Sequence, residues 1–319
     1  MAVEGLAPAA SLLIAGLILD ALIGDPQFRY HPIRLIGRTL SACEAFLRRL
    51  NWDGYGGGCI LFVFLVVLWV VLPSLLVVWV GPLLHIFLVY VFFALRNLID
   101  HVRDVRRTAG RGDVHAARQA ISLLVGRDTD SMDVDACRRA AIESLSENFV
   151  DGFLSPLFWY AVIGIPGLLL FKVVSTMDSM VGYKTPQYLR FGWCGARLDD
   201  AMNYIPARLS WLILGVSALV FPSLSSRKGF RVGFEQHSTL PGPNPGWSEA
   251  TMAGLLQRRL IGSIWKDGVL VTKLWLGDSN DPEGGSDRDV RYALHVTMVA
   301  AAVSTVLAIL WIHIIVPTS

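Results

Sequence analysis

Long runs of apolar residues constrain this chain more than any other feature of its sequence. A helix that crosses a lipid bilayer needs about 20 consecutive apolar residues. Six runs approach that length, namely Ala7–Gly24, Gly58–Val80, Pro82–Leu98, Pro156–Val174, Tyr204–Leu224 and Ala293–Val316. Only 17% of the residues are charged, whereas about 25% is usual in soluble domains. The sequence therefore predicts an all-α integral membrane protein.

The six runs differ in how well they suit a membrane span. The second, third and last are uninterrupted, and Gly81-Pro82 should make a tight helical hairpin of the second and third. Asp20 interrupts the first run. A Gly164–Gly167 break divides the fourth, and Pro206 opens the fifth, where a proline removes a helical hydrogen bond. We expect a helical bundle with four spans plus two broken or re-entrant segments, and the number of spans stays open between four and six.

Basic residues predict which loops face the cytoplasm. Arginines and lysines follow the first, third and fifth runs, and neither terminus carries one. By the positive-inside rule those loops are cytoplasmic and both termini lie outside. Either the two broken runs both span, which places Ser175–Asn203 outside, or both dip in and return, which keeps that segment cytoplasmic. The second alternative is favoured by the cations Lys172, Lys184, Arg190, Arg197 and Arg208. We expect a multi-pass protein of the inner (cytoplasmic) membrane with its active site on the cytoplasmic side.

The whole chain, residues 1–319, reads as a single membrane domain with two cytoplasmic regions. Residues 100–152 should form a helical pair, with one helix over Val114–Val125 and a second beginning near Ser131. Asp133 and Asp135 would then lie in the first turn of the second helix, where a negative charge suits the helix dipole. Residues 225–289 are rich in Gly, Pro and Asp and are expected to be a loop region with short helical or strand-like pieces.

Several function classes are disfavoured by composition and by missing motifs. A net charge of +2 without any Lys/Arg-rich run argues against a nucleic-acid partner. The four cysteines have neither CxxC nor zinc-site spacing. The sequence contains no Walker A loop, Rossmann fingerprint, HExxH or GxSxG motif, so any nucleotide would need an unfamiliar site.

An acidic stripe precedes the fourth apolar run. Glu143, Glu147 and Asp151 recur at four-residue spacing, with Asn148 beside them. Like charges at this spacing destabilise an isolated helix, and a divalent cation bound by carboxylate oxygens would offset the repulsion. The alternative is a solvated acidic face that pairs with Arg138 and Arg139.

A denser group of polar residues surrounds the start of the fifth run. Its charged and amide members are Asp178, Lys184, Arg197, Asp199, Asp200, Asn203 and Arg208. Arg and Lys bind phosphate, and adjacent carboxylates can hold a metal or transfer protons. The alternative is a juxtamembrane loop whose cations extend toward the lipid headgroups, but this does not explain the acidic pair Asp199-Asp200.

Two weaker polar groups complete the candidates. Asp20, His31 and Arg34 lie at the end of the first run, where His31 could simply satisfy backbone groups. A Pro/Gly loop with Asn244 leads to a helix expected to start near Ser248. A helix N-terminus can bind anions, although many ordinary turns look the same.

Together these strings resemble the CobD/CbiB family of cobalamin biosynthesis, the adenosylcobinamide-phosphate synthases. The resemblance runs from about Gly16 to Leu260 and depends on several separate motifs. In chain order they are Gly24-Asp25-Pro26, His31-Pro32, Gly126-Arg127-Asp128-Thr129, Glu143 with Glu147-Asn148 and Asp151-Gly152, Met177–Gly182, Ala196–Asp200, Pro206-Ala207-Arg208 and the Asn244–Gly254 loop. Ser175 and Pro245 depart from the family pattern, which affects substrate detail more than the class of activity.

The resemblance implies an ATP-dependent ligase that forms an amide. It would join the propionate carboxyl of adenosylcobyric acid, a corrinoid, to aminopropanol or to its O-phosphate, with ATP and Mg²⁺ as cofactors. A homo-oligomer or a complex with other membrane enzymes of the pathway is left open. The rival interpretations are a transporter and a non-catalytic membrane signalling protein.

We assign roles to residues on this hypothesis. The metal ligands would be Glu143, Glu147, Asp151 and Asp178. The catalytic carboxylates would be Glu147, Asp151, Asp199 and Asp200. The residues that bind substrate or ATP would be His31, Arg34, Arg127, Asp128, Asn148, Lys184, Arg197, Asn203, Arg208 and Asn244.

Overall fold

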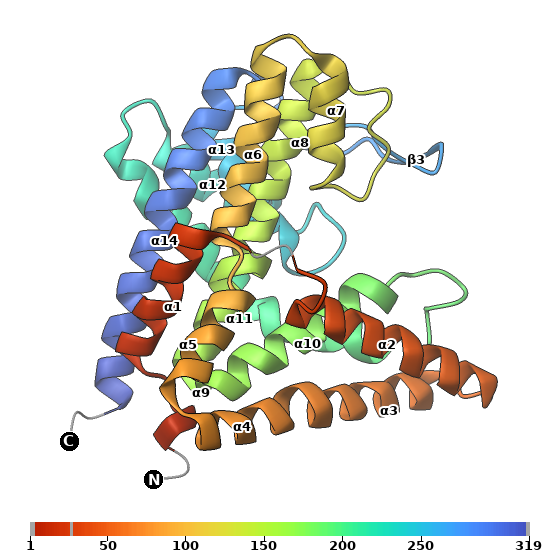
Figure 1. Ribbon diagram of the computed structural model, residues 1–319. Coiled ribbons are helices and arrows are strands. Elements are labelled where there is room, and N and C mark those ends of the chain that lie inside the picture. Colours follow the sequence, from red (N-terminus) through yellow and green to blue (C-terminus); the bar gives the residue numbers. More distant parts are fainter. Residues whose placement is uncertain (1–3, 26–27, 317–319) are drawn as a thin grey trace. The chain divides into compact units, whose positions relative to one another are not determined.

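The computed structural model describes residues 4–25 and 28–316, so Pro26 of the Gly24-Asp25-Pro26 motif lies outside the described residues. The chain is built of helices, and the described residues include only four short strands (Figure 1). This confirms the prediction of an all-α fold. By its internal contacts the chain forms two compact units, and we describe each by itself. Unit 1 comprises residues 1–94, 155–203 and 306–319, and unit 2 comprises residues 95–154 and 204–305.

The elements follow one another along the chain as the labels of Figure 1 show. The α-helices are α1 (Ala10–Ile23), α2 (Pro32–Arg49), α3 (Tyr55–Val66), α4 (Leu72–Val80), α5 (Pro82–Phe92), α6 (Leu95–Gly110), α7 (Val114–Ser122), α8 (Val134–Phe149), α9 (Ser155–Ile163), α10 (Ile165–Val181), α11 (Trp193–Ser217), α12 (Ser226–Gln236), α13 (Pro245–Leu256) and α14 (Asp287–Ile315). The 3-10 segment η1 (Glu4–Leu6) precedes α1, and the π-helical segments η2 (Val67–Val71) and η3 (Val150–Leu154) and the 3-10 segment η4 (Ala218–Val220) lie between the α-helices. The strands are β1 (Leu260–Ile261), β2 (Ile264–Lys266), β3 (Val269–Thr272) and β4 (Trp275–Leu276).

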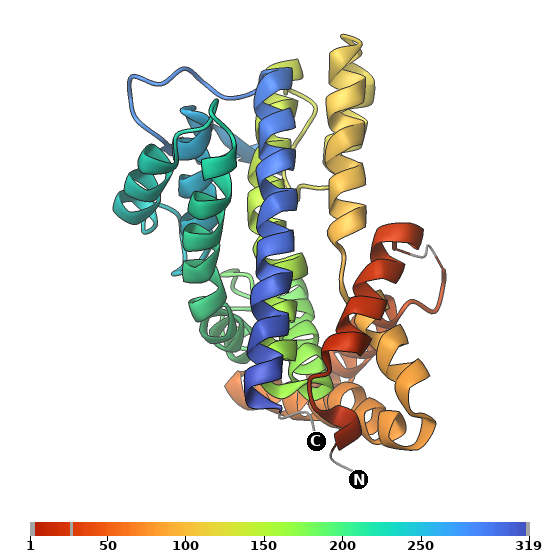
Figure 2. The same cartoon turned by 90° about the vertical axis from the view of Figure 1, so that its left-hand side faces the viewer.

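In the part of the chain that the structure describes, four helical stretches are long and apolar enough to cross a membrane, which supports a multi-pass membrane protein. They are Tyr55–Val80, Pro82–Gly110, Trp193–Val220 and Asp287–Ile315. Figure 2 shows α14, the last of them, as one uninterrupted helix. Three of the four correspond to the second, third and last apolar runs. The first run forms the shorter helix α1, and the remaining long stretch comes instead from the fifth run.

Unit 1 is organised around α10, which packs against α2, α3, η2, α5 and α9. Most residues of this helix are buried, including Phe171, Val173 and Val174. The Pro156–Val174 run is therefore split into α9 and a central helix, α10, which continues past the run to Val181.

Glycines with positive φ make both of the expected breaks in unit 1. Gly81, with φ of 84°, alone separates α4 from α5, and Gly164, with φ of 77°, alone separates α9 from α10. In each case the next helix has proline in its first turn, where the missing N–H costs nothing. A side chain at Gly164 would also collide with the carbonyl oxygen of Leu6. The predicted breaks are confirmed.

The helix of the fifth apolar run was expected to begin at Pro206, and this expectation was wrong. Helix α11 begins at Trp193 and contains Pro206 in its interior. Polar residues such as Arg197 lower the hydropathy of its first half, so this half does not appear as part of an apolar run in the sequence. Proline leaves the carbonyl of Met202 without its helical donor, and the indole Nε1–H of Trp159 donates to that oxygen at 3.0 Å instead.

Unit 2 contains the predicted helical pair and a third helix, α6, that packs against both members. Figure 1 shows α6, α7 and α8 side by side. Helix α8 begins at Val134 rather than near Ser131, because Asp133 is its N-cap and accepts the Ala136 N–H at 2.7 Å. Asp133 therefore precedes the first turn in which it was expected.

The region 225–289 proves to be more ordered than a loop. Helices α12 and α13 pack together, β1 pairs with β4, and β2 pairs with β3, both antiparallel. The β2–β3 hairpin turns at Asp267 and Gly268, with φ of 52° and 74°. Positive φ at both residues is the requirement of the two-residue hairpin turn for which Asp-Gly is preferred. Helix α13 starts at Pro245, earlier than the start expected near Ser248.

Candidate functional site

The acidic stripe of unit 2 lies on one continuous helical stretch. Glu143 and Glu147 belong to α8, and Asp151 follows in the π-helical segment η3. The helix therefore continues through all three acidic residues, as the spacing requires. Single π-helical turns are rare in proteins, and those that occur often lie at functional sites.

Glu143 is buried and held by two partners. One carboxylate oxygen forms an ion pair with Arg127, and the other accepts the backbone N–H of Ile261 at 2.7 Å. Ile261 has φ of 77°, which is a genuine outlier for a β-branched residue. Glu143 thus ties the segment between α7 and α8, which carries Arg127, to strand β1 and fixes a strained backbone.

Glu147 and Glu249 have no such partners. Glu249 lies on α13, which packs against α8, and only 5% of its surface is exposed. Within residues 4–25 and 28–316, no hydrogen bond or ion pair reaches the carboxyl group of either residue. Sequence reasoning assigned no role to Glu249, because no local pattern shows that α13 is buried on every side.

Burial and neighbouring charges raise the pKa of both carboxyls. Loss of water raises the pKa of Glu249 well above its ordinary value of 4.5, and the charges of Glu147, Glu143 and Asp151 raise it further. Loss of water on burial raises the pKa of Glu147, the charge of Arg127 lowers it, and the charge of Glu143 raises it again. The surface of Glu147 is still exposed, so water offsets part of its shift, and Glu249 carries the larger one.

Two other predicted residues near the stripe are engaged by the fold. Asp128 accepts the N–H groups of Asp267 and Gly268 at 3.1 and 2.8 Å and so holds the β2–β3 hairpin turn. The Asn148 amide donates to the Ser144 carbonyl at 2.9 Å and to its hydroxyl at 3.0 Å. Their binding roles stay predictions.

The structure associates Arg208 and Asn244 with the first turn of α13. The Arg208 guanidinium lies 3.4 Å from the ring centre of Tyr204 and 5.1 Å from that of Trp247, which belongs to α13. It also donates to the Tyr204 carbonyl at 2.7 Å. Asn244 is the buried N-cap residue of the same helix. These two predicted residues are therefore brought to one end of α13, although they are far apart in the sequence.

Unit 1 brings a second group of predicted residues together on α10 and the first half of α11. A chain of hydrogen bonds runs from the Ser155 hydroxyl to the side-chain oxygen Oδ1 of Asn203 at 2.5 Å, and from the side-chain Nδ2 of Asn203 to Asp199 at 3.0 Å. Ser155 was missed, because a serine at the start of an apolar run carries no distinctive sequence signal.

The remaining charges of this group surround Asp199. Asp178 on α10 interacts electrostatically with both Asp199 and Asp200. Arg197 lies 3.8 Å from Asp200 and is exposed, and Lys184, also exposed, acts on Asp200 as a second cation. Unit 1 therefore combines three carboxylates with two exposed cations.

His31 and Arg34 lie at the start of α2 in unit 1. The His31 Nε2 atom lies 3.0 Å from Asp25, and His31 is buried at the N-cap position of the helix. Arg34 is exposed in the first turn. Their roles in substrate binding stay predictions.

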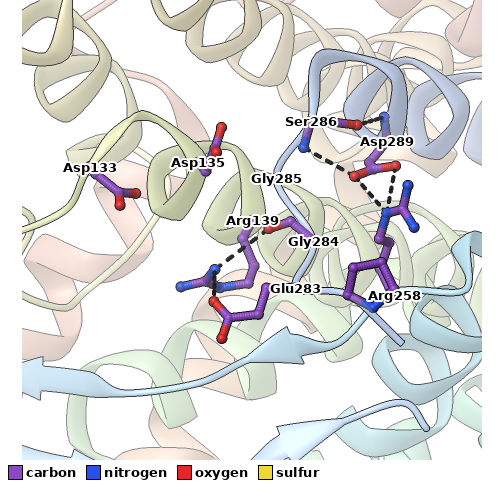
Figure 3. Close-up of a pocket in the computed structure, with 10 residues that line it drawn as sticks. Asp133, Asp135, Arg139, Arg258, Glu283, Gly284, Gly285, Ser286 and Asp289 are labelled. Carbon is purple, nitrogen blue, oxygen red and sulfur yellow. Dashed lines mark hydrogen bonds and ion pairs between the residues drawn. The ribbon is translucent and has the colours of Figure 1, made fainter. Parts of the chain in front are cut away.

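A cavity of about 330 Å³ in unit 2 is lined by charged residues, four of which pair with one another (Figure 3). Arg258 Nε lies 3.1 Å from each carboxylate oxygen of Asp289, and Arg139 lies 3.5 Å from Glu283. The lining includes none of the predicted site residues, so we do not assign the reaction to it.

No group of three or more His, Cys, Asp or Glu side chains is arranged to hold a metal ion in the part of the chain that the structure describes. The predicted ligands are divided between the units, since Asp178 belongs to unit 1 and Glu143, Glu147 and Asp151 belong to unit 2. Mg²⁺ often takes only one or two carboxylates and completes its shell with water and substrate phosphates. The metal role stays a prediction.

Comparison with known proteins gives consistent matches along most of the chain. The model of the CobD/Cbib protein family matches residues 13–297. Cobalamin biosynthesis protein CobD of Rhizobium meliloti (strain 1021) is 38% identical over 308 residues, which cover 92% of this chain and 94% of the relative. The CobD protein of Sinorhizobium sp is 40% identical over 277 residues (82% and 85%), and the CbiB protein of Salmonella typhi is 35% identical over 302 residues (92% and 94%). No solved structure matches the chain.

Proposed function

The chain belongs to the CobD/CbiB family and has a role in cobalamin biosynthesis, and from this membership we propose that it is an ATP-dependent ligase. It joins the propionate carboxyl of adenosylcobyric acid to aminopropanol or its O-phosphate through an amide bond. The observation that carries the proposal is the family match across residues 13–297. The two polar groups of the structure supply residue types that such a reaction needs.

The chemistry requires an activated carboxyl group. The propionate oxygen attacks the γ-phosphorus of ATP, so that an acyl phosphate forms and ADP leaves. The amine nitrogen then attacks the acyl carbon, the carbon–oxygen bond to phosphate breaks, and inorganic phosphate leaves. The amine arrives as an ammonium ion, so a base must first take up one of its protons.

In unit 2 the carboxylates and Arg127 suit a nucleotide with its cation. Glu147 would be a ligand of Mg²⁺, which when bound neutralises charge that develops on the transferred phosphoryl group. The buried Nε–H of Arg127 has no acceptor among the described residues, which leaves that donor for a phosphate oxygen. Glu143 would orient Arg127 through their ion pair. Arg208 would bind a second anionic group from its place beside Trp247.

In unit 1 Asp199 is our candidate for the base. Asn203, itself held by Ser155, donates to one oxygen of Asp199 and fixes the side chain. Lys184 and Arg197 are exposed cations beside Asp200 and would attract the phosphate of aminopropanol phosphate. We further propose that this group works on the cytoplasmic side of the inner membrane.

The decisive assay uses purified protein in detergent with ATP, Mg²⁺, adenosylcobyric acid and either aminopropanol or its phosphate. We expect a product whose mass equals the two substrates minus one water, together with one ADP per product. A protein that leaves ATP untouched and instead moves the corrinoid across a vesicle membrane would be a transporter and would overturn the proposal.

Sidedness has its own test. Single cysteines at Ser179 and Tyr183, placed in a variant without the native cysteines, should react with an impermeant thiol reagent only after the membrane is opened. Both positions are exposed, so a reagent on the correct side can reach them. Labelling from outside intact cells would overturn the cytoplasmic placement.

A further inference from the structure

Helix α13 is buried on every side, which leaves its one acidic residue in an unusual position. All residues from Gly246 to Leu256 are buried. The two hydroxyl groups of the helix find partners inside it: the Thr251 hydroxyl donates to the Trp247 carbonyl at 2.5 Å, and the Ser248 hydroxyl donates to the Pro245 carbonyl at 3.4 Å. Glu249 has no such partner in the described part of the chain.

The charges around Glu249 do not balance. Among the described residues, the charges that act on it come from Glu147, Glu143 and Asp151, against the cation Arg127. Arg127 is already engaged by Glu143. Burying an ion without compensation is costly, so protons or a bound cation must neutralise part of this negative charge.

The two unpartnered carboxyls differ in this respect from Glu143. Both oxygens of Glu143 are used, one by Arg127 and one by the N–H of Ile261. Glu147 and Glu249 lie on the packed helices α8 and α13 and keep both of their oxygens for another ligand. Mg²⁺ favours oxygen ligands and commonly takes one or two carboxylates.

We infer that Glu147 and Glu249 form the carboxylate pair that binds a divalent cation, while Glu143 is a positioning residue that holds Arg127 and strand β1. This replaces Glu143 by Glu249 in the ligand set that the sequence suggested. The inference rests on the proposed function only for the choice of Mg²⁺ as the cation. Raised pKa values of both carboxyls agree with it, since a cation would compete with protons for the pair.

The test measures cation binding without ATP or corrinoid. Mn²⁺, which binds oxygen ligands as Mg²⁺ does, is titrated into the full-length protein in detergent and followed by electron paramagnetic resonance, with Mg²⁺ as competitor. We expect Glu249→Gln and Glu147→Gln each to weaken binding by roughly tenfold or more, because even residues that only support a ligand contribute about 10–100-fold to metal affinity. Glu143→Gln should weaken binding less than either of them.

The matched control is Glu235→Gln, which removes an exposed carboxylate of α12 that pairs with Arg231; it should bind Mn²⁺ as the wild type does. Thermal unfolding in EDTA and in Mg²⁺ gives a second readout. Mg²⁺ should raise the Tm of the wild type and of Glu235→Gln, but not that of Glu249→Gln, which should stay folded because an amide replaces an unpaired buried carboxyl.

The outcomes separate the inference from the proposed function. Unchanged Mn²⁺ affinity in Glu249→Gln, or no binding by the wild type, overturns the inference even if the ligase assay succeeds. Loss of binding in both Gln variants supports it even if no amide product forms. A wild type whose only response is proton uptake, with no cation bound, also overturns it, because the pair would then share a proton.

Discussion

The two polar groups of this protein hold their carboxylates in different ways. In unit 1 Asp199 is the end of a hydrogen-bond chain that runs through Asn203 to Ser155. In unit 2 Glu249 is buried without any partner among the described residues, and the one nearby guanidinium is committed to Glu143.

This difference distinguishes carboxylates that the protein holds in place from carboxylates that are available to bind a ligand. A buried polar group that has all its partners is fixed in place and adds rigidity. A buried carboxyl without partners is costly and persists where a ligand completes it. We therefore expect changes in unit 1 to alter chemistry or stability without affecting cation binding, whereas changes at Glu249 should weaken cation binding.

The largest effect is expected for Asp199→Asn in unit 1. If Asp199 is the base, the rate of amide formation should fall by about 10²- to 10⁴-fold, measured in single turnovers with saturating ATP. Affinity for Mn²⁺ should not change. A variant that keeps wild-type turnover would remove Asp199 from the reaction, and one that loses Mn²⁺ would break the separation of the two groups.

Removal of Arg127 should give the next largest effect. Arg127→Ala leaves Glu143 buried without its cation, and breaking a buried ion pair costs about 3–5 kcal/mol. Thermal or denaturant unfolding of the detergent-solubilised protein measures the loss. The double variant Arg127→Ala/Glu143→Gln should recover part of the stability, because the stranded charge is gone. No recovery would mean that the pair does not act as a unit.

A smaller effect is expected for Asn203→Ala, which breaks the hydrogen-bond chain in unit 1. Leaving buried groups without their hydrogen-bond partner costs about 1–3 kcal/mol, so the Tm should fall. Turnover should fall as well, since Asp199 loses the amide that holds it. Ser155→Ala is the milder control, because it removes only the hydrogen bond farthest from Asp199. An equal loss of turnover in both variants would contradict the proposal that Asn203 holds Asp199 directly and Ser155 acts only through Asn203.

The smallest effect is a pH dependence at Glu249. Its pKa in the folded protein is above the ordinary value of 4.5, so the folded state keeps a proton that the unfolded chain releases. Without a cation, the wild type should therefore lose stability relative to Glu249→Gln as pH rises above about 4.5, until the folded-state pKa is passed. If the stabilities of the wild type and of Glu249→Gln in EDTA changed with pH by the same amount, Glu249 would not have the raised pKa.

Hydropathy and backbone-breaking residues made much of the fold predictable, because both act locally. Three of the four long apolar helices and the breaks at Gly81 and Gly164 follow from such signals. Helix α11 was placed too late, because Asp199 and Asp200 interrupt its apolar character although they lie within the helix. The same polar residues that mark a site therefore conceal the element that carries it.

The candidate site was predictable only in part. The charged members of both groups stand out in an apolar chain, and the structure gathers Asp178, Asp199 and Asp200 in unit 1. Glu249 and Ser155 were not predicted, because burial of a residue depends on which helices pack around it. Likewise, the engagement of Glu143 with Ile261 joins positions 118 residues apart, a separation that no local pattern encodes.

The central claim is that the carboxyl group of the corrinoid is activated by phosphoryl transfer from ATP, and isotope transfer tests it most directly. Adenosylcobyric acid is labelled with oxygen-18 in its free propionate carboxyl and turned over with ATP, Mg²⁺ and aminopropanol phosphate. The account predicts that one labelled oxygen appears in the inorganic phosphate for each amide formed. Amide formation with the label absent from phosphate, or found in AMP, would contradict it.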